Sequence, residues 1–292
     1  MPVAAGRRSS SLVGDYAALT KPRLNLLVVA TSAAGYYLGA PPQPDWPGMA
    51  EAVAGTALVA AGAAVLNQLY ERHTDALMRR TRRRPLPAGR LSPEEARMFG
   101  LALAASGVAL LAFRANLVAA ALALATLGIY LAVYTPLKRK SPGATLVGAI
   151  PGALPPLIGW TAAQGRISVG GMALFAIVFL WQIPHFMAIA WMYRDDYAQA
   201  GFPMLPVIEP NGRRTGRHAV VYAAALLPVS VAPAFLGVAG WIYFWVALVL
   251  GVGMVWLAAR FAATRLESSA RRLFFGSIVY LPLLWAAMIL DH

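Results

Sequence analysis

Nine long apolar segments limit how this chain can fold more than any other feature of its sequence. They lie at roughly residues 24–41, 51–69, 98–113, 117–135, 144–163, 170–190, 218–237, 241–259 and 271–289. A helix of about 17–25 apolar residues crosses the hydrocarbon core of a bilayer. Helices and closed barrels alone satisfy every backbone hydrogen bond there. The sequence therefore predicts an all-α membrane protein with nine transmembrane helices in a bundle.

The composition agrees with this interpretation. The chain is 59% hydrophobic and only 13% charged, whereas soluble domains carry about 25% charged residues. No polar linker separates the apolar segments, so we expect one domain over residues 15–292. Residues 1–14 contain no apolar signal region with a cleavage site, and we expect them to be a disordered cytoplasmic tail. The absence of cysteine excludes disulfides and thiolate metal sites.

Basic residues predict the orientation in the membrane. With a cytoplasmic N-terminus, 23 of the 25 lysines and arginines fall on the cytoplasmic side, and only Arg114 and Arg166 fall outside. Loops rich in lysine and arginine stay in the cytoplasm. We therefore expect the N-terminus inside and the C-terminus outside. The net charge of +13 then indicates contact with the lipid surface of a bilayer, not with nucleic acid.

A polar ladder ends the second apolar segment. Asn67, Glu71 and Asp75 are spaced four residues apart, so they share one face if the helix continues past the membrane edge. Two carboxylates and an amide oxygen are hard ligands of the kind that Mg²⁺ prefers. The alternative is a solvated helix end, in which the two acids pair with Arg72 or Arg79.

An arginine cluster follows the ladder, comprising Arg79, Arg80, Arg82, Arg83 and Arg84. Arginine binds phosphate groups through two parallel hydrogen bonds. Carboxylates that hold Mg²⁺ beside guanidinium groups would form a diphosphate site, and we select Arg79, Arg80 and Arg84 as its candidates. The alternative is an anchor for anionic lipid, worth about 1 kcal/mol per basic residue near the surface.

Two further polar clusters lie where later apolar segments end on the cytoplasmic side. Tyr134, Lys138 and Arg139 belong to the string YTPLKRK after the fourth segment. Their cations would hold a diphosphate or merely fix the topology. Asp195 and Asp196 follow the sixth segment, at a position that mirrors the ladder. They would complete a two-metal diphosphate site or form a surface turn with the neighbouring arginine.

Four strings of this sequence together resemble the UbiA-type intramembrane prenyltransferases, and within them the branch that farnesylates protoheme IX. They are DYAALTKPR at 15–23, NQLYERHTDALMRRTRRRPLPAGRLS at 67–92, YTPLKRKSPGATLVGAIPGALPPLIGW at 134–160 and WQIPHFMAIAWMYRDDYAQAGFPMLPV at 181–207. Two positions depart from the broader family. Glu71 replaces an aspartate, and Ala200 stands where a second acid would follow Asp196.

The resemblance implies a bundle around a central cavity near the cytoplasmic face, in the inner membrane of a bacterial cell. It implies farnesyl diphosphate and protoheme IX as substrates, Mg²⁺ as cofactor and heme O as product. Heme A synthase or the assembly of a terminal oxidase would then be partners. The metal residues that it suggests are Asn67, Glu71, Asp75, Asp195 and Asp196, and Lys138 with Arg139 match its basic pair.

Three residues are candidates for contact with the heme. His185 lies within the sixth segment, and Lys21 and Arg23 precede the first. The histidine would bind the heme, or it would be a packed residue with an ordinary hydrogen bond. The two cations would face the propionates, or they would serve only the topology.

Other functions stay open at this point. A relative could prenylate a quinone precursor or a tetrapyrrole carboxylate, although the strings above favour heme. A transporter would place charged or broken segments near the bilayer midplane, whereas the ionisable residues here gather at one face. A non-catalytic heme-binding chaperone would not need the polar ladder.

Overall fold

The computed structural model describes residues 11–292, and all regular structure in them is helical. Nine long helices match the nine apolar segments, which confirms the predicted bundle. These are α2 (Pro22–Gly39), α3 (Trp46–Asp75), α4 (Pro93–Arg114), α5 (Leu117–Gly128) continued by η1 (Ile129–Tyr134) and α6 (Thr135–Leu137), α7 (Ala144–Gln164), α8 (Val169–Met192), α11 (Arg213–Phe235), α12 (Trp241–Thr264) and α13 (Glu267–Leu290). Three short helices join them, namely α1 (Leu12–Leu19), α9 (Arg194–Gln199) and α10 (Leu205–Ile208).

One of the nine long helices is less apolar than the rest. Within residues 11–292, eight helices are long and apolar enough to cross a membrane, and α2 is not among them. Thr31 and Ser32 of α2 are buried, and the Ser32 hydroxyl donates to Thr56 of α3 at 3.3 Å. Helix α2 packs on both α3 and α7. Neighbouring helices therefore shield these two hydroxyl groups from lipid.

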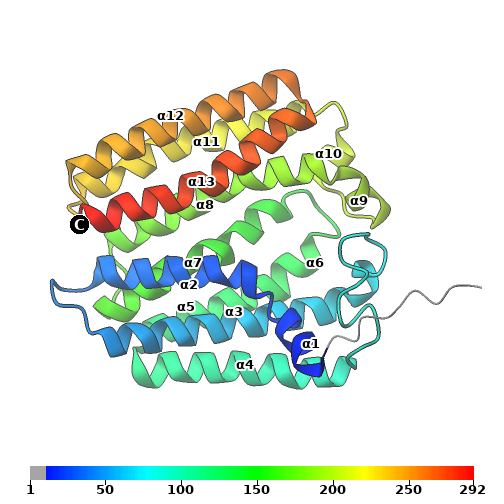
Figure 1. The fold of residues 1–292 in the computed structure, drawn as a ribbon, viewed down its shortest axis with the longest axis horizontal. Helices are drawn as coiled ribbons and strands as arrows, with labels where there is room; N and C mark the ends of the chain where they lie inside the picture. The colour runs from blue at the N-terminus through cyan, green and yellow to red at the C-terminus, as the bar shows by residue number, and fades with distance from the viewer. Residues whose placement is uncertain (1–10) are drawn as a thin grey trace, which may run out of the picture.

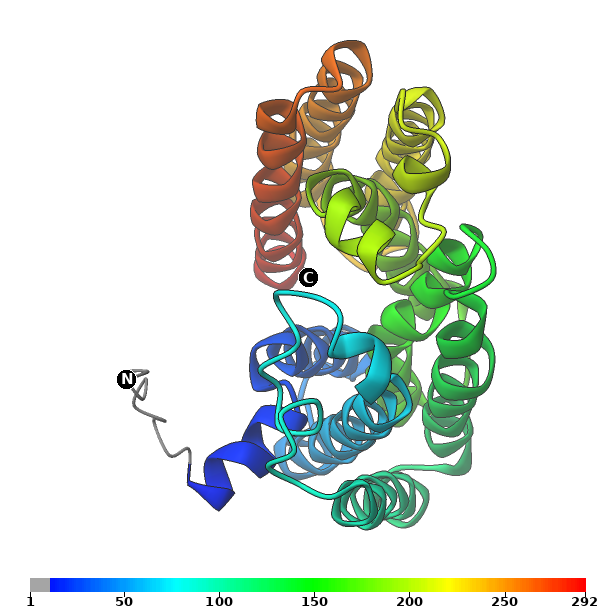
Figure 2. The same ribbon diagram turned by 90° about the vertical axis from the view of Figure 1, so that its right-hand side faces the viewer.

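The long helices form two packed groups. Helices α2, α3, α4, α5 and α7 enclose one core, and α8, α11, α12 and α13 enclose most of the other. Contacts of α7 with α8 and of α2 with α13 join the two groups. Figure 2 shows the long helices nearly end-on, arranged around the centre of the molecule.

Glycines allow the closest approach between helices in the first group. A Cβ atom on Gly35 of α2 would collide with the backbone carbonyl of Pro156 of α7. A Cβ atom on Gly159 of α7 would likewise collide with the carbonyl of Ser32. Small residues at such crossings let transmembrane backbones pack closely. The glycines thus fix α2 against α7, beside the helix that carries the ladder.

The connections that bear the polar clusters gather at one end of the bundle. Helices α1, α6, α9 and α10 lie at this end, and the C-terminus lies at the other (Figure 1). Part of the expected tail is structured, because residues 12–14 form the first turn of α1, where Ser11 accepts the Gly14 N–H at 3.1 Å. The rest of the expected tail, residues 1–10, lies outside the described residues.

Candidate active site

Helix α3 carries the polar ladder beyond the expected membrane edge. It has 30 residues and is therefore about 45 Å long, whereas the hydrocarbon core of a bilayer is about 30 Å thick. Asn67, Glu71 and Asp75 occupy its last three turns and are 2%, 7% and 1% exposed. The continuous helix that the spacing required is present, and its polar face is covered by protein instead of water.

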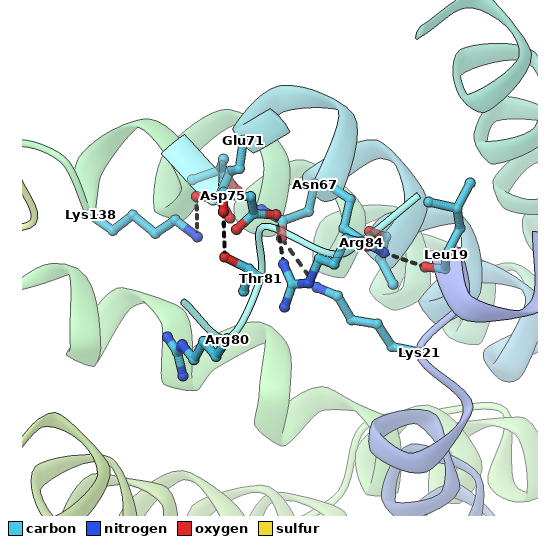
Figure 3. A network of polar contacts seen from close by, with 12 residues as sticks. Leu19, Lys21, Asn67, Glu71, Asp75, Arg80, Thr81, Arg84 and Lys138 are labelled. Atoms are coloured by element: carbon cyan, nitrogen blue, oxygen red, sulfur yellow. Dashed lines mark hydrogen bonds and ion pairs between the residues drawn. The ribbon is translucent and has the colours of Figure 1, made fainter. Parts of the chain in front are cut away.

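Each rung of the ladder meets a cation from a different segment (Figure 3). Lys138, just after α6, forms an ion pair with Glu71 Oε1. Arg84 Nη1 donates to Asp75 Oδ2 at 2.7 Å. Lys21, at the junction of α1 and α2, places its Nζ 3.5 Å from Asn67 Oδ1.

The two acids do not pair with the arginines next to them in sequence. Arg72 donates instead to the Leu69 carbonyl at 3.0 Å, and Arg79 is exposed. The partners Lys21, Arg84 and Lys138 come from three connections that are distant along the chain. The fold therefore assembles a compact site of alternating charge at the end of α3, and not a solvated helix end.

A second layer of hydrogen bonds fixes Asn67, and sequence reasoning did not identify it. Asn67 Nδ2 donates to Thr135 Oγ1 at 3.0 Å, and the Tyr130 hydroxyl lies 3.4 Å from Asn67 Oδ1. Both partners belong to η1–α6, where the helix widens into a π-helical turn. Pro136 supplies no N–H there, and Thr135 Oγ1 donates to the Tyr130 carbonyl at 2.7 Å. Such turns often occur at functional sites.

The ladder oxygens retain capacity for a further ligand. Glu71 Oε1 is buried and, despite its ion pair with Lys138, has no hydrogen bond of ordinary geometry. The contacts of Asn67 Oδ1, at 3.4 and 3.5 Å, are longer than typical hydrogen bonds. One oxygen of Asp75 is held by Arg84. Buried, under-used carboxylate and amide oxygens on one helix face fit a hard cation such as Mg²⁺.

The lysines around the ladder favour an added anion. Burial, reinforced by the charges of Arg84 and Lys138, lowers the pKa of the Lys21 ammonium to about 8. Burial also lowers the pKa of the Lys138 ammonium, although Glu71 opposes this shift. An anion bound between these groups would raise both pKa values and favour their charged forms. The geometry and the charge thus suit a ligand such as a diphosphate.

Two more of the predicted phosphate-binding residues, Arg80 and Tyr134, make contacts at this end of the bundle. Arg80 Nη2 donates to the Tyr197 hydroxyl of α9 at 2.9 Å, and its guanidinium lies 4.9 Å from the centre of that ring. Lys138 Nζ lies 5.2 Å from the centre of the Tyr134 ring. All three arginines, Arg79, Arg80 and Arg139, are exposed. Tyr197 is a further residue that sequence reasoning missed.

The second acidic pair stands apart from the ladder. Asp195 and Asp196 lie in the first turn of α9, where Asp195 is exposed and Asp196 is half-buried. The described residues contain no group of three or more His, Asp and Glu side chains close enough to share a metal ion. The four predicted carboxylates therefore do not form a single cluster in this structure.

The candidate heme contacts are not gathered together. His185 Nδ1 lies 2.7 Å from the Ser277 hydroxyl, and its ring stacks at 5.0 Å on both Trp181 and Phe274. Lys21 is drawn into the ladder, whereas Arg23 is exposed. The His185 environment is the packed, hydrogen-bonded one of the alternative interpretation.

Two surface hollows flank α1 and its junction with α2. The smaller, of 210 Å³, is lined by residues 21–24, so Lys21 connects it to the ladder. The larger, of 560 Å³, lies between α1 and α4 and is lined by Tyr16, Phe99 and their neighbours, none of which belongs to the ladder. The chemistry of the ladder, not the size of a hollow, therefore identifies the candidate site.

Comparison with known proteins gives consistent matches over almost the whole chain. The model of the UbiA prenyltransferase family matches residues 28–280. A protoheme IX farnesyltransferase of Solibacter usitatus is 45% identical, covering 95% of this chain and 98% of that protein. One of Koribacter versatilis is 46% identical, covering 97% and 94%. The mitochondrial protoheme IX farnesyltransferase of Arabidopsis thaliana is 40% identical, covering 95% of this chain and 64% of that protein.

Solved structures with low sequence identity share the fold. A structure described as digeranylgeranylglyceryl phosphate synthase superposes with a TM-score of 0.82 at 17% identity, covering 96% of this chain and 98% of that chain. A UbiA homologue from Archaeoglobus fulgidus bound to GPP and Mg²⁺ superposes with a TM-score of 0.66 at 18% identity, covering 94% and 99%. The helical arrangement is therefore that of known UbiA homologues.

Proposed function

The chain belongs to the UbiA prenyltransferase family, and from that membership we propose that it transfers the farnesyl group of farnesyl diphosphate to a vinyl group of protoheme IX. The products are heme O and diphosphate. The observation that carries this proposal is the 45% identity to a protoheme IX farnesyltransferase over 95% of the chain. The charged site at the end of α3 supplies the chemistry that such a transfer needs.

The reaction requires stabilisation of a leaving diphosphate. Mg²⁺ held by Asn67, Glu71 and Asp75 would neutralise the negative charge that builds on the diphosphate as its bond to the farnesyl carbon breaks. Arg80, Arg84 and Lys138 provide hydrogen-bond donors for the same group. Preorganised donors in a water-excluded site contribute roughly 3–4 kcal/mol each. No protein nucleophile is involved.

The ion pairs of the ladder imply an exchange of partners on substrate binding. Lys138 and Arg84 neutralise Glu71 and Asp75, and a buried carboxylate without a partner is costly. If the carboxylates held a metal ion, the two cations would turn from them to the incoming phosphate oxygens, and each charged group would keep a partner of opposite charge.

The bond changes balance without any further reactant except water. The C–O bond of farnesyl diphosphate breaks, and its electron pair leaves with the diphosphate. The π electrons of the heme vinyl group form the new bond to the farnesyl carbon. Water adds to the resulting cation and loses a proton, which gives a hydroxyethylfarnesyl group. The Tyr134 ring, beside Lys138, is placed to stabilise positive charge by cation–π contact.

The remaining candidate residues are given roles at the edge of this site. Asp195 and Asp196 would supply carboxylates to a second metal position, and Arg79 and Arg139 would bind the outer phosphate oxygens. Arg23, which lines the hollow of residues 21–24, would face a heme propionate. His185 is assigned no heme contact, because its ring is packed between Trp181 and Phe274 and its Nδ1 pairs with Ser277. Heme A synthase and terminal oxidase assembly would receive the product.

The proposed orientation follows the charge distribution. The N-terminus and the ladder face the cytoplasm, and the C-terminus lies outside the inner membrane, because 23 of the 25 basic residues then remain inside. Farnesyl diphosphate therefore enters from the cytoplasmic side, with its tail among the lipid-facing helices.

A choice of acceptors tests this function. Purified chain in detergent would be given farnesyl diphosphate and Mg²⁺ with either protoheme IX or 4-hydroxybenzoate, and the products would be identified by mass spectrometry. We expect farnesylation of the heme only. Farnesylation of 4-hydroxybenzoate alone would replace the proposal with quinone synthesis. The absence of any product would favour a transporter or a heme-binding chaperone.

A further inference from the structure

A buried ion pair outside the ladder joins α1 to the loop that carries the arginines. Asp15 of α1 is only 4% exposed. Arg90 Nε donates to both of its carboxylate oxygens at 3.0 Å. Neither residue belongs to the ladder or to the cations that contact it. A carboxylate buried this deeply with a charged partner is costly to disturb, because removal of one partner leaves the other uncompensated.

Another nitrogen of the Arg90 guanidinium links Asp15 to the segment that contacts the ladder. Arg90 Nη2 donates to the Arg83 carbonyl at 3.2 Å. The next residue, Arg84, donates to Asp75 at 2.7 Å. Within the segment of residues 76–92, which we call the arginine loop, the Arg90 N–H also donates to the Pro85 carbonyl at 2.9 Å. Asp15 therefore reaches the ladder through Arg90 and the backbone of the arginine loop.

Helix α1 is a fixed support and not a loose appendage. Gln68 of α3, next to Asn67, donates to the Leu19 carbonyl at the end of α1 at 2.6 Å. The Leu19 side chain is fully buried with Val65 of α3 and with Leu86 and Leu91 of the arginine loop. Figure 3 shows the Leu19 contact beside Arg84 and Lys21. Because α1 packs against both α3 and the arginine loop, a shift of α1 would also shift the loop.

We propose that Asp15 and Arg90 are positioning residues, which hold the arginine loop so that Arg84 lies against the ladder and meets the diphosphate of the substrate. This inference rests on the proposed function and extends it to two residues that contact neither substrate. Displacement of a binding group by about 1 Å costs up to roughly 100-fold in rate. A pair that merely stabilised the fold would affect both substrates alike, whereas a positioning pair affects the one that binds the arginines.

The test compares two single variants with the double variant. Asp15→Asn keeps the size of the side chain and removes its charge. Arg90→Gln removes the same contact by changing its partly exposed partner. This variant remains informative if Asp15→Asn fails to fold. We expect each to raise the KM for farnesyl diphosphate roughly tenfold and to change the KM for protoheme IX less than about twofold. The double variant should be no worse than either single one, because all remove one contact.

A control shows whether the loss of any nearby carboxylate has this effect. Glu94 of α4 forms an exposed ion pair with Arg97 at 3.2 Å, and exposed pairs contribute little. Glu94→Gln should therefore leave both KM values unchanged. Equal changes for the two substrates in Asp15→Asn and Arg90→Gln would overturn the proposal and leave a structural role only.

A second readout does not depend on turnover. Trypsin cleaves after arginine, so the rate of cleavage within residues 79–84 reports how firmly the arginine loop is held. We expect severalfold faster cleavage in Asp15→Asn and Arg90→Gln, and weaker protection by Mg²⁺ with inorganic diphosphate. This assay still judges the proposal if the wild-type chain transfers no farnesyl group. Cleavage and protection like those of the wild type in both variants would refute it.

Discussion

Replacement of Asp75 by asparagine should slow heme O formation by roughly 100- to 1,000-fold, while the protein still folds and inserts. Asp75 is 1% exposed, lies on the ladder face and accepts a hydrogen bond from Arg84 at 2.7 Å. Asparagine has the same shape, so the bundle is preserved. The neutral amide is a weaker ligand for Mg²⁺ and a weaker partner for the guanidinium. The measurement is the initial rate of heme O formation by purified protein.

A matched control lies on the same helix. Glu51, near the other end of α3, also pairs with an arginine, since Arg114 Nη2 lies 2.6 Å from its carboxylate. Glu51→Gln should retain the wild-type rate, because this pair is remote from the ladder. Full activity of Asp75→Asn would remove the metal ladder from the mechanism. Equal losses of activity in Asp75→Asn and Glu51→Gln would show that removing any carboxylate from α3 impairs folding, whether or not it lies in the ladder.

Removal of divalent cations should abolish prenyl transfer by the wild-type chain. The ladder holds two carboxylates and an amide, and Glu71 Oε1 and Asn67 Oδ1 lack good hydrogen bonds. Without a metal ion, the leaving diphosphate would face these negative charges directly. Excess EDTA should therefore reduce the rate to the background, and added Mg²⁺ should restore it.

Binding measurements separate the metal from the chemistry. Calorimetry should detect binding of inorganic diphosphate in the presence of Mg²⁺ and much weaker binding in EDTA. EDTA does not extract the iron of protoheme, so the acceptor substrate stays intact in both conditions. Undiminished turnover in excess EDTA would contradict the proposed role of the ladder.

Local patterns in the sequence predicted the bundle and the ladder well. The apolar segments specified nine helices because lipid leaves few other ways to satisfy the backbone. The spacing of Asn67, Glu71 and Asp75 placed them on one face because α3 continues to Asp75. Among the nine long helices only α2 falls short of a simple hydropathy rule, and its Thr31 and Ser32 are covered by other helices.

The partners of the ladder were less accessible to sequence reasoning. Lys21, Arg84 and Lys138 come from three connections, and their convergence depends on how the helices pack. Arg84 could not be distinguished from its neighbouring arginines by residue type, because the path of the loop alone determines which side chain turns inward. Tyr130 reaches Asn67 only through the π-helical turn of η1, which no spacing rule indicated.

The most direct test of the central claim is to analyse the hemes of a host that makes no heme O of its own and expresses this chain. The chain would be expressed in such a bacterium, and the extracted hemes would be separated by chromatography and identified by mass spectrometry. Our account predicts a new heme that carries a hydroxyethylfarnesyl group, absent from cells without the gene and strongly reduced with Asp75→Asn. Protoheme alone, in cells whose membranes contain the folded protein, would contradict it.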